Sequence, residues 1–408
     1  IASISVLDAL FEQAIAEREA ALAAPRPALG SVMMVAGSLG SGGAERQFVN
    51  TAVGLHKLAD RQGMINGYAI RGPVQVLVQS LVSRSDGKFF LPQLLDAGVP
   101  VTAYETLPDF GGSLRPSADP SILNALKFLP PSIARGVIKL TAAFRTAAPD
   151  VVQIWQDGII FAVGLAAVLS GIPRIVLNAR TLPPKDRWVR YPVEYDIIYK
   201  SLLRCRGVTL TVNSRHLVGR YAAWLGVDRG CIEVIPNGVK TLSSAPDRSA
   251  EGLFRAFDAR TGTSALTLGA VMRFDDNKRP LLWIDAAAAI HKALGSARFV
   301  IVGDGLLRRY AMARARAHGI ADRCLFVGRS SCVGYWLSKM DLLMLLSKRE
   351  GLPNALIEAQ LARVPVITTP AGGAIETVIP EVTGIVTNPA PSPEEIAAIV
   401  RSLVQVPG

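Results

Sequence analysis

The chain has 408 residues, of which 50% are hydrophobic and 19% are charged. This composition excludes a disordered chain, and the length exceeds what one hydrophobic core usually supports, so we expect a compact protein of two domains. The formal net charge of +11 favours anionic partners such as nucleotide diphosphates, lipid phosphates or nucleic acid, and does not choose among them.

Three global features bear on the compartment. The four cysteines form no Cys-x-x-Cys pair, which favours reduced, buried thiols in a cytoplasmic protein over zinc or redox chemistry. The apolar run 158–173 is shorter than the about 20 residues of a membrane-spanning helix, so we predict a buried helix. Because the chain begins at Ile1 and not at a methionine, we expect a fragment whose targeting segment lies elsewhere.

The predicted elements begin with a helix over residues 3–24, which the prolines at 25 and 27 cut off from the rest. From residue 31 the chain alternates between strand and helix patterns, which is typical of a doubly wound parallel sheet in an α/β protein. The strands that we expect in this part of the chain are 31–35, 74–78, 101–104, 151–155, 174–178 and 208–212.

A second strand and helix series follows the turn residues Ile-Pro-Asn-Gly at 235–238. Its predicted strands are 266–272, 298–302, 325–327, 342–346 and 366–369. The chain therefore divides into a helical appendage and linker (1–28), a Rossmann-like domain (29–238) and a second Rossmann-like domain (239–408). Ligands of such sheets bind at the carboxyl ends of the strands, so we expect a cleft between the two domains.

The first candidate binding motif is a glycine-rich loop, residues 37–46, between the first strand and its helix. Gly42 and Gly43 let backbone N–H groups approach a phosphate at a helix N-terminus. A flexible surface turn is the alternative, because the loop matches neither a dinucleotide-binding fingerprint nor an ATPase phosphate loop.

Two further motifs follow strands of the second domain. Arg273 and Lys278 stand after its first strand, where two cations suit a diphosphate, although a solvated charged loop has the same composition. The neighbouring acids 275–276 suggest either a metal ligand or plain solvated residues. Gly303-Asp304-Gly305 follows the next strand, where a tight turn and a nucleotide contact are equally good interpretations.

The most informative motif is Glu-Gly-Leu-Pro-Asn-Ala-Leu-Ile-Glu, from Glu350 to Glu358. Pro353 and Asn354 start a helix whose free N–H groups favour an anion or a hydroxyl group. Glu350 lies just before that helix and Glu358 about one turn inside it. An exposed acidic pair is the alternative, but the position at a sheet edge favours ligand binding.

In combination and in this order, the motifs resemble the retaining glycosyltransferases of family 4, whose two-domain architecture is called GT-B. The resemblance covers about residues 30 to 400. It rests on the Gly-Gly-Ala-Glu-Arg loop, residues 212–214 and 234–238, Arg273 with Lys278, residues 303–305, and Glu350 through Glu358.

The resemblance implies the role of each site residue. Arg273 and Lys278 would hold the donor diphosphate, Gly42 and Gly43 would close over it, and Glu358 would bind the ribose. Glu350 would be catalytic and grip the transferred sugar together with the backbone amides of Gly351, Leu352, Pro353 and Asn354. No metal and no cofactor would be required, because cations and a helix dipole do the work of a magnesium ion.

One departure from the family concerns a histidine that many relatives carry after the fourth strand of the first domain. This sequence has Trp155-Gln156-Asp157 there, so Asp157 is our second catalytic candidate, and altered or lost activity is the alternative. Retention of configuration proceeds either through a covalent intermediate or through same-face attack, and the sequence does not decide between them.

The partners implied are a nucleotide sugar and a polysaccharide or lipid-linked acceptor of a bacterial surface. The donor is UDP-linked by preference, with GDP as the alternative. The basic segments 180–191 and 127–145 suggest acceptor binding and peripheral contact with an anionic membrane at the inner face of the plasma membrane, against the alternative of ordinary surface loops. No nucleic-acid motif is present. An inactive nucleotide-sugar-binding scaffold and an epimerase of the same architecture are the rival functions.

Overall fold

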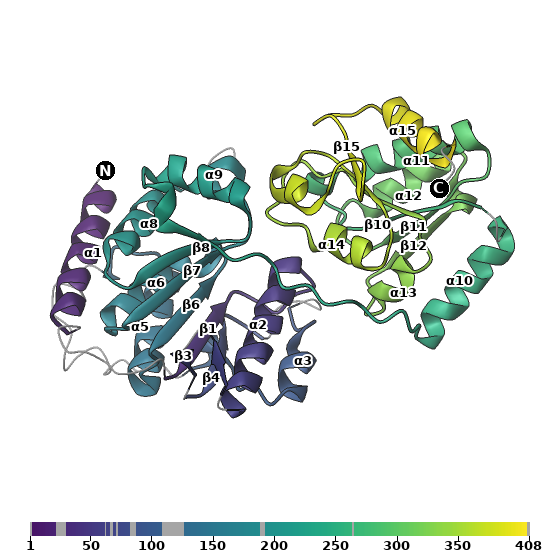
Figure 1. Cartoon of the computed structure of the whole chain (residues 1–408). Coiled ribbons are helices and arrows are strands. Elements are labelled where there is room, and N and C mark those ends of the chain that lie inside the picture. Colours follow the sequence, from purple (N-terminus) through teal and green to yellow (C-terminus); the bar gives the residue numbers. More distant parts are fainter. Residues whose placement is uncertain are drawn as a thin grey trace. The chain divides into compact units, whose positions relative to one another are not determined.

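The computed structural model describes residues 2–21, 30–61, 63–65, 68–70, 72–81, 87–107, 126–187, 192–262 and 265–405. The chain forms two compact units, unit 1 (Ile1–Gly238) and unit 2 (Val239–Gly408), and each contains a parallel sheet with helices (Figure 1). The predicted proline linker lies outside the described residues.

The described part of unit 1 contains a seven-stranded parallel sheet in the order β5-β4-β1-β6-β7-β8-β9. All five residues of β1 are buried, as expected for a strand with helices on both faces. The strands are β1 (Val32–Ala36), β4 (Val74–Val78), β5 (Val101–Ala103), β6 (Val151–Trp155), β7 (Arg174–Ala179), β8 (Val208–Val212) and β9 (Ile232–Val234). A short antiparallel pair, β2 (Met64–Ile65) with β3 (Tyr68–Ala69), was not predicted, and neither was β9.

Helices cover both faces of this sheet, which confirms the doubly wound prediction. One apolar cluster joins a strand face to α2 and α3, and the other joins the opposite face to α1, α5, α6, α8 and α9. The helices of unit 1 are α1 (Ala2–Ala21), α2 (Gly43–Asp60), α3 (Leu91–Asp96), α5 (Pro131–Ala147), α6 (Ile160–Leu169), α7 (Pro184–Arg187), α8 (Glu194–Arg204) and α9 (Arg215–Leu225).

Helix α1 is part of the unit 1 core, whereas the sequence predicts a helical appendage outside it. Leu7 and Phe11 recur at helical spacing and are buried in the cluster shared with α6 and α8. Arg18 is also buried, and its guanidinium donates hydrogen bonds to the carbonyl oxygens of Ile172 and Pro173, both at 3.0 Å. The helix is therefore fixed by apolar packing at one end and by a buried cation at the other.

Unit 2 repeats this architecture with a six-stranded parallel sheet in the order β12-β11-β10-β13-β14-β15. Its strands are β10 (Thr267–Val271), β11 (Arg298–Val302), β12 (Cys324–Gly328), β13 (Leu342–Leu345), β14 (Val366–Thr368) and β15 (Gly384–Val386). Apolar clusters on the two faces involve the helices α10 (Arg248–Thr261), α11 (Pro280–Leu294), α12 (Arg308–Ala317), α13 (Val333–Leu337), α14 (Asn354–Leu361) and α15 (Pro393–Gln405).

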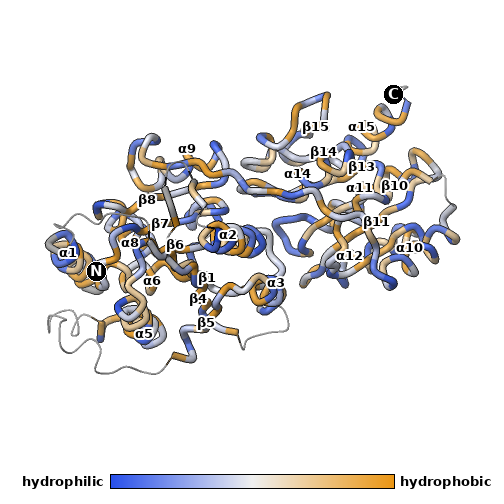
Figure 2. The backbone as a smooth tube through the Cα atoms, turned by 60° about the horizontal axis from the view of Figure 1, so that its bottom comes forward, coloured by the Kyte–Doolittle hydropathy of each residue, from blue (hydrophilic) through white to orange (hydrophobic). Residues whose placement is uncertain are grey.

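Helix α2 is amphipathic. In Figure 2 the tube of α2 alternates between hydrophobic and hydrophilic residues, because one helix face packs on the sheet and the other meets water.

The four cysteines are free thiols, and the expectation of buried thiols holds for Cys205 and Cys324 but is wrong for Cys231, which is exposed. In each sheet the parallel strands bring the loops that follow them to one edge, here called the carboxyl edge.

Candidate functional site

The carboxyl edge of unit 2 holds a lysine in contact with a glutamate. Lys278 ends a 3₁₀ turn (Asp276–Lys278) between β10 and α11, and Glu350 lies in the loop between β13 and α14. The Lys278 Nζ forms an ion pair with Glu350 Oε1, and the two side chains are only 20% and 11% exposed. Because water is largely excluded, this pair is stronger than an ordinary surface pair.

Arg273 does not join this pair. Its side chain is 72% exposed, and its Nε donates a hydrogen bond to Asp275 Oδ2 at 2.5 Å. An exposed pair of this kind contributes little to stability, so the guanidinium is free to exchange Asp275 for an anionic ligand.

The two adjacent acids of this loop are each paired with a cation. Asp276 accepts hydrogen bonds from the Lys348 Nζ, 2.7 Å from each carboxylate oxygen, and this contact lowers the pKa of Asp276 below its ordinary value. In the part of the chain that the structure describes, no group of three or more His, Cys, Asp or Glu side chains is arranged to hold a metal ion.

The loop from Glu350 to Asn354 leads directly into α14. Asn354 is the first residue of the helix, and both Asn354 and Glu358 are buried, at 7% and 4% exposure. The backbone of Glu350 is held by close packing against Gly372, where a Cβ would lie 2.2 Å from the Glu350 carbonyl oxygen. The start of α14 is therefore a fixed surface of backbone N–H groups next to the Lys278–Glu350 pair.

Arg279 organises this edge, and sequence reasoning gave it no role. Its backbone is left-handed, with φ of 48°, and its guanidinium donates to carbonyl oxygens of three loop residues. The partners are Leu346 at 2.5 Å, Ser347 at 2.9 Å and Pro389 at 3.1 Å. Arg279 thus ties the Lys278 turn to the loops that follow β13 and β15.

The glycines at 303 and 305 are required by backbone packing. Their φ angles are 131° and 150°, and a Cβ at Gly303 would lie 1.8 Å from the carbonyl oxygen of Met272. At Gly305 a Cβ would lie 2.6 Å from the carbonyl oxygen of Phe274. The loop after β11 therefore supports the loop that carries Arg273, whether or not it also contacts a nucleotide.

The glycine-rich loop of unit 1 ends at the N-terminus of α2. Gly42 precedes the helix and Gly43 is its first residue, so their backbone groups lie where the helix dipole favours an anion. A Cβ at Gly42 would meet only the carboxylate of Glu45, which is flexible and can move away. The fold itself does not demand glycine at this position.

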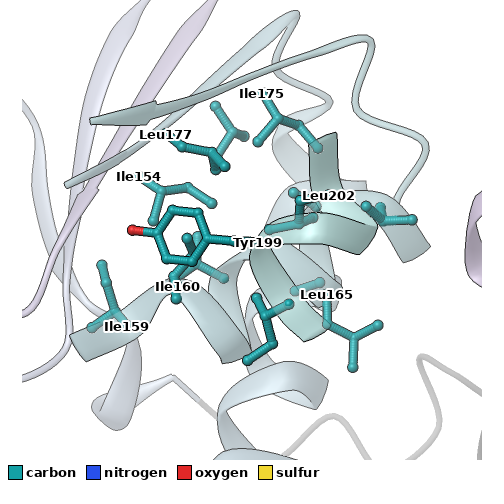
Figure 3. Packing of buried hydrophobic residues seen from close by; sticks show 14 of the residues in the cluster. Ile154, Ile159, Ile160, Leu165, Ile175, Leu177, Tyr199 and Leu202 are labelled. Carbon is teal, nitrogen blue, oxygen red and sulfur yellow. The ribbon is translucent and has the colours of Figure 1, made fainter. Parts of the chain in front are cut away.

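Asp157, the second catalytic candidate, is buried at 5% exposure just after β6. Arg187 donates to one of its carboxylate oxygens and the Tyr199 hydroxyl donates to the other. Burial, reinforced by the Asp157 carboxylate, raises the pKa of Tyr199 well above its ordinary value. Figure 3 shows the ring of Tyr199 surrounded by Ile154, Ile159, Ile160, Leu165, Ile175, Leu177 and Leu202.

Gln156, between β6 and Asp157, has a strained backbone. Its φ of 69° and ψ of 155° fall in a region that is essentially restricted to glycine. Its N–H donates to the carbonyl oxygen of Asn178 at 3.2 Å. Strain of this kind concentrates at functional sites, and no sequence signal announces it at a glutamine.

Arg180 follows β7 and lies at the same edge. Its Cζ is 4.4 Å from the centre of the buried Trp155 ring. Its Nη1 donates to the carbonyl oxygen of Ile235 at 3.1 Å and to Asn237 Oδ1 at 3.3 Å, and its Nη2 donates to Asn178 Oδ1 at 3.3 Å. Burial lowers the pKa of Arg180 to about 10.

The two basic segments proposed for acceptor or membrane contact behave differently. Of the first, residues 188–191 lie outside the described residues. The second forms α5, and its apolar side chains Val137, Leu140 and Phe144 are buried in the unit 1 core, which accounts for its amphipathic pattern. Among the described helices, none has the length and apolar character needed to cross a bilayer.

Two Rossmann-like units, each with a parallel sheet and candidate binding residues at its carboxyl edge, define the GT-B class of protein. Residues 258–407 match the family model for glycosyl transferases group 1, and residues 90–241 match the model for Glycosyltransferase Family 4. The chain therefore belongs to the family-4-like glycosyltransferases.

Its relatives include a polysaccharide biosynthesis protein and a galactosyltransferase. The Vi polysaccharide biosynthesis protein VipC/TviE of Salmonella typhi is 37% identical over 370 residues, which are 90% of this chain and 64% of that protein. An Escherichia coli UDP-Gal:alpha-D-GlcNAc-diphosphoundecaprenol alpha-1,3-galactosyltransferase is 30% identical over 215 residues, 51% of this chain and 54% of that enzyme. The Anabaena protein Alr3699/HepE, solved with UDP and glucose, has the same fold, with a TM-score of 0.69, 19% identity, and coverage of 92% and 90% of the two chains.

Proposed function

We propose that the protein is a retaining glycosyltransferase that moves a hexosyl or N-acetylhexosaminyl unit from a nucleotide sugar to a polysaccharide or lipid-linked acceptor. The observation that carries the proposal is the shielded Lys278–Glu350 pair beside the start of α14. A UDP-linked donor is preferred over a GDP-linked one, which is supported by the donor in the name of the Escherichia coli relative and by the UDP bound to HepE.

In this proposal the diphosphate of the donor binds to Lys278 and Arg273. Both lysine and arginine currently contact carboxylates of their own unit, and a diphosphate competes for these cations because it carries more negative charge. The same contacts strengthen as negative charge grows on the leaving phosphate, which lowers the barrier without a metal ion.

The donor sugar and ribose bind around α14. When phosphate engages Lys278, Glu350 is released to orient the sugar and to stabilise the positive charge that develops at its anomeric carbon. The backbone N–H groups of Gly351, Leu352 and Asn354 bind sugar hydroxyls, and Glu358 binds the ribose. Both routes to retention, a covalent intermediate and same-face attack, are compatible with this arrangement.

For Asp157 the contacts support a positioning role. Both of its carboxylate oxygens are already engaged by Arg187 and Tyr199, so the group has little freedom to contact a sugar. We assign it to the support of the strained Gln156 turn and of the segment that carries Arg187.

The proposal is tested by calorimetric titration with UDP- and GDP-sugars and by a transfer assay, on the wild type, Lys278→Ala and Glu350→Gln. Lys292→Ala is the matched control, because Lys292 is exposed near the other end of α11. We expect the affinity for the donor to fall about tenfold or more in Lys278→Ala. Turnover should be lost in Glu350→Gln, and the control should behave as the wild type does.

Three results would contradict the proposal. Binding of a nucleotide sugar without turnover, with lipid-linked and polysaccharide acceptors supplied, would identify a nucleotide-sugar-binding scaffold instead. An absence of binding by every nucleotide sugar would remove the donor site itself. Interconversion of the donor sugar without transfer would favour an epimerase.

A further inference from the structure

Arg180 is a half-buried cation of unit 1 that has no carboxylate partner among the described residues. Its guanidinium contacts neutral oxygens and the Trp155 ring. Desolvation is the one cause of its lowered pKa, which at about 10 still leaves the guanidinium charged at neutral pH. Burying a charge without a partner is costly, so a compensating anion is expected.

Other polar atoms beside Arg180 also lack a partner. The Arg180 Nε, the Asn213 Oδ1 and the Ser214 Oγ are buried and have no hydrogen-bond partner, and Asn213 and Ser214 are only 2% and 1% exposed. Arg180 and Asn213 belong to one network, since Asn237 Oδ1 accepts from both Arg180 Nη1 and Asn213 Nδ2, and Ser214 is the next residue after Asn213. Unsatisfied buried polar groups are rare in folded proteins, and the two of these that can donate, the Arg180 Nε and the Ser214 hydroxyl, favour an anion.

The location is one that ligands use. Arg180 follows β7, and Asn213 with Ser214 follows β8, so all three lie at the carboxyl edge of a parallel sheet. Arg180 is only partly buried as a whole residue, which leaves the guanidinium a route to solvent. The stacked indole and the three acceptor oxygens hold the guanidinium plane fixed, and a fixed guanidinium suits an oxyanion with two oxygens.

We propose that Arg180 is the centre of an oxyanion-binding subsite in unit 1, which takes a carboxylate or phosphate group of the acceptor. The assignment of the group to the acceptor rests on the proposed function; the anion site itself does not. The acceptor is thus an acidic sugar or a phosphate-bearing lipid, and a neutral glycan would leave the Arg180 charge uncompensated.

The test titrates the full chain with inorganic phosphate, with glucuronate and with methyl glucoside, at constant ionic strength. All titrations use a Lys278→Ala background, because Lys278 is the other candidate phosphate ligand. Binding is followed by calorimetry and by tryptophan emission, since an anion at Arg180 changes the field at an indole 4.4 Å away.

We expect saturable binding of phosphate, glucuronate or both, and none of the uncharged glucoside. Binding of glucuronate alone indicates that the acceptor supplies a carboxylate, and binding of phosphate alone indicates that it supplies a phosphate. Arg180→Gln should lose about tenfold or more in affinity, and Arg180→Lys should retain part of it, because lysine keeps the charge but not the planar fork. The control is Arg174→Gln, a change at the exposed first residue of β7, at the opposite end of that strand from Arg180, which should bind as the parent does.

The Trp155→Phe variant keeps the proposal testable if Arg180→Gln does not fold. It should retain saturable calorimetric binding, weakened because the smaller ring holds the guanidinium less firmly, and lose the emission change, which locates the anion beside Trp155. The inference is overturned if neither anion saturates, or if Arg180→Gln binds as well as the parent. A UDP titration of the chain with Lys278 intact tests the proposed function separately. If UDP binds but neither anion does, the Arg180 subsite is overturned and the donor site is not. Anion binding at Arg180 without UDP binding would support the site and overturn the donor proposal.

Discussion

Units 1 and 2 share an architecture, yet they treat charge differently at the carboxyl edges of their sheets. In unit 2 the cations lie against carboxylates, Lys278 with Glu350 and Lys348 with Asp276. In unit 1 the carboxylate of Asp157 is buried and already bound, whereas the cation of Arg180 contacts neutral oxygens only. A ligand of unit 2 must therefore displace an existing partner, while a ligand of unit 1 supplies a missing one.

The largest effect on stability is expected from removal of the buried acid of unit 1. Asp157→Ala leaves the Arg187 charge and the Tyr199 hydroxyl without their partner, so we expect the free energy of unfolding to fall by about 3 kcal/mol. Urea denaturation followed by fluorescence measures it. Asp276→Ala, at an acid of unit 2 whose side chain is 80% exposed, is the control and should shift the midpoint only slightly. Equal shifts in both variants would refute the distinction.

The strained turn of unit 1 gives the next largest effect. Gln156→Gly relieves a conformation that other residues avoid, and after the entropy cost of glycine we expect a net gain in stability of about 1 kcal/mol. Gln153→Gly, in the regular strand β6, should instead destabilise. Thermal denaturation of both variants checks the prediction. A loss of stability in Gln156→Gly would show that contacts of the glutamine side chain stabilise the fold by more than its backbone strain costs.

In unit 2 the exchange of partners predicts a gain of affinity. Glu350→Gln removes the carboxylate that competes for Lys278, so we expect UDP without a sugar to bind roughly threefold more tightly. The same variant should fail in transfer, because the sugar has lost its carboxylate. Calorimetry with UDP at low and high salt measures the effect, and weaker UDP binding would mean that Glu350 contacts the nucleotide favourably.

The smallest effect concerns the exposed pair of Asp276 and Lys348. The pKa of Asp276 is lowered in the folded state, so its contribution to stability is present above the ordinary aspartate pKa and is lost as the pH falls through the lowered value. We expect Lys348→Ala to cost less than about 0.5 kcal/mol at neutral pH. Melting curves of wild type and variant should differ at neutral pH and converge in acid.

Much of the fold could be predicted because buried parallel strands read as continuous apolar runs. Strands 74–78, 151–155, 208–212 and 298–302 have the predicted bounds. The missed strands have two or three residues, too few for any periodicity to be recognised. The role of α1 was misjudged because burial of Leu7 and Phe11 depends on α6 and α8, which lie far along the chain.

The candidate site could be predicted only in part. Position at the end of a strand places Lys278 and Glu350 at one edge, but their contact across 72 residues of sequence depends on strand order. The contact of Arg273 with Asp275 is a local choice of partner that position at the end of a strand does not predict. The missing counter-charge of Arg180 and the backbone strain of Gln156 have no counterpart in composition or spacing.

The position of α1 has a consequence for synthesis on the ribosome. The helix leaves the ribosome before its partners, and α8 (Glu194–Arg204) emerges only after about 180 further residues, which takes roughly 10 to 40 seconds. Throughout that interval Leu7 and Phe11 have no core to enter and stay available to chaperones or to other nascent chains. A segment made before its partners is thus secured only after them, which makes cotranslational protection of α1 a condition for good yield.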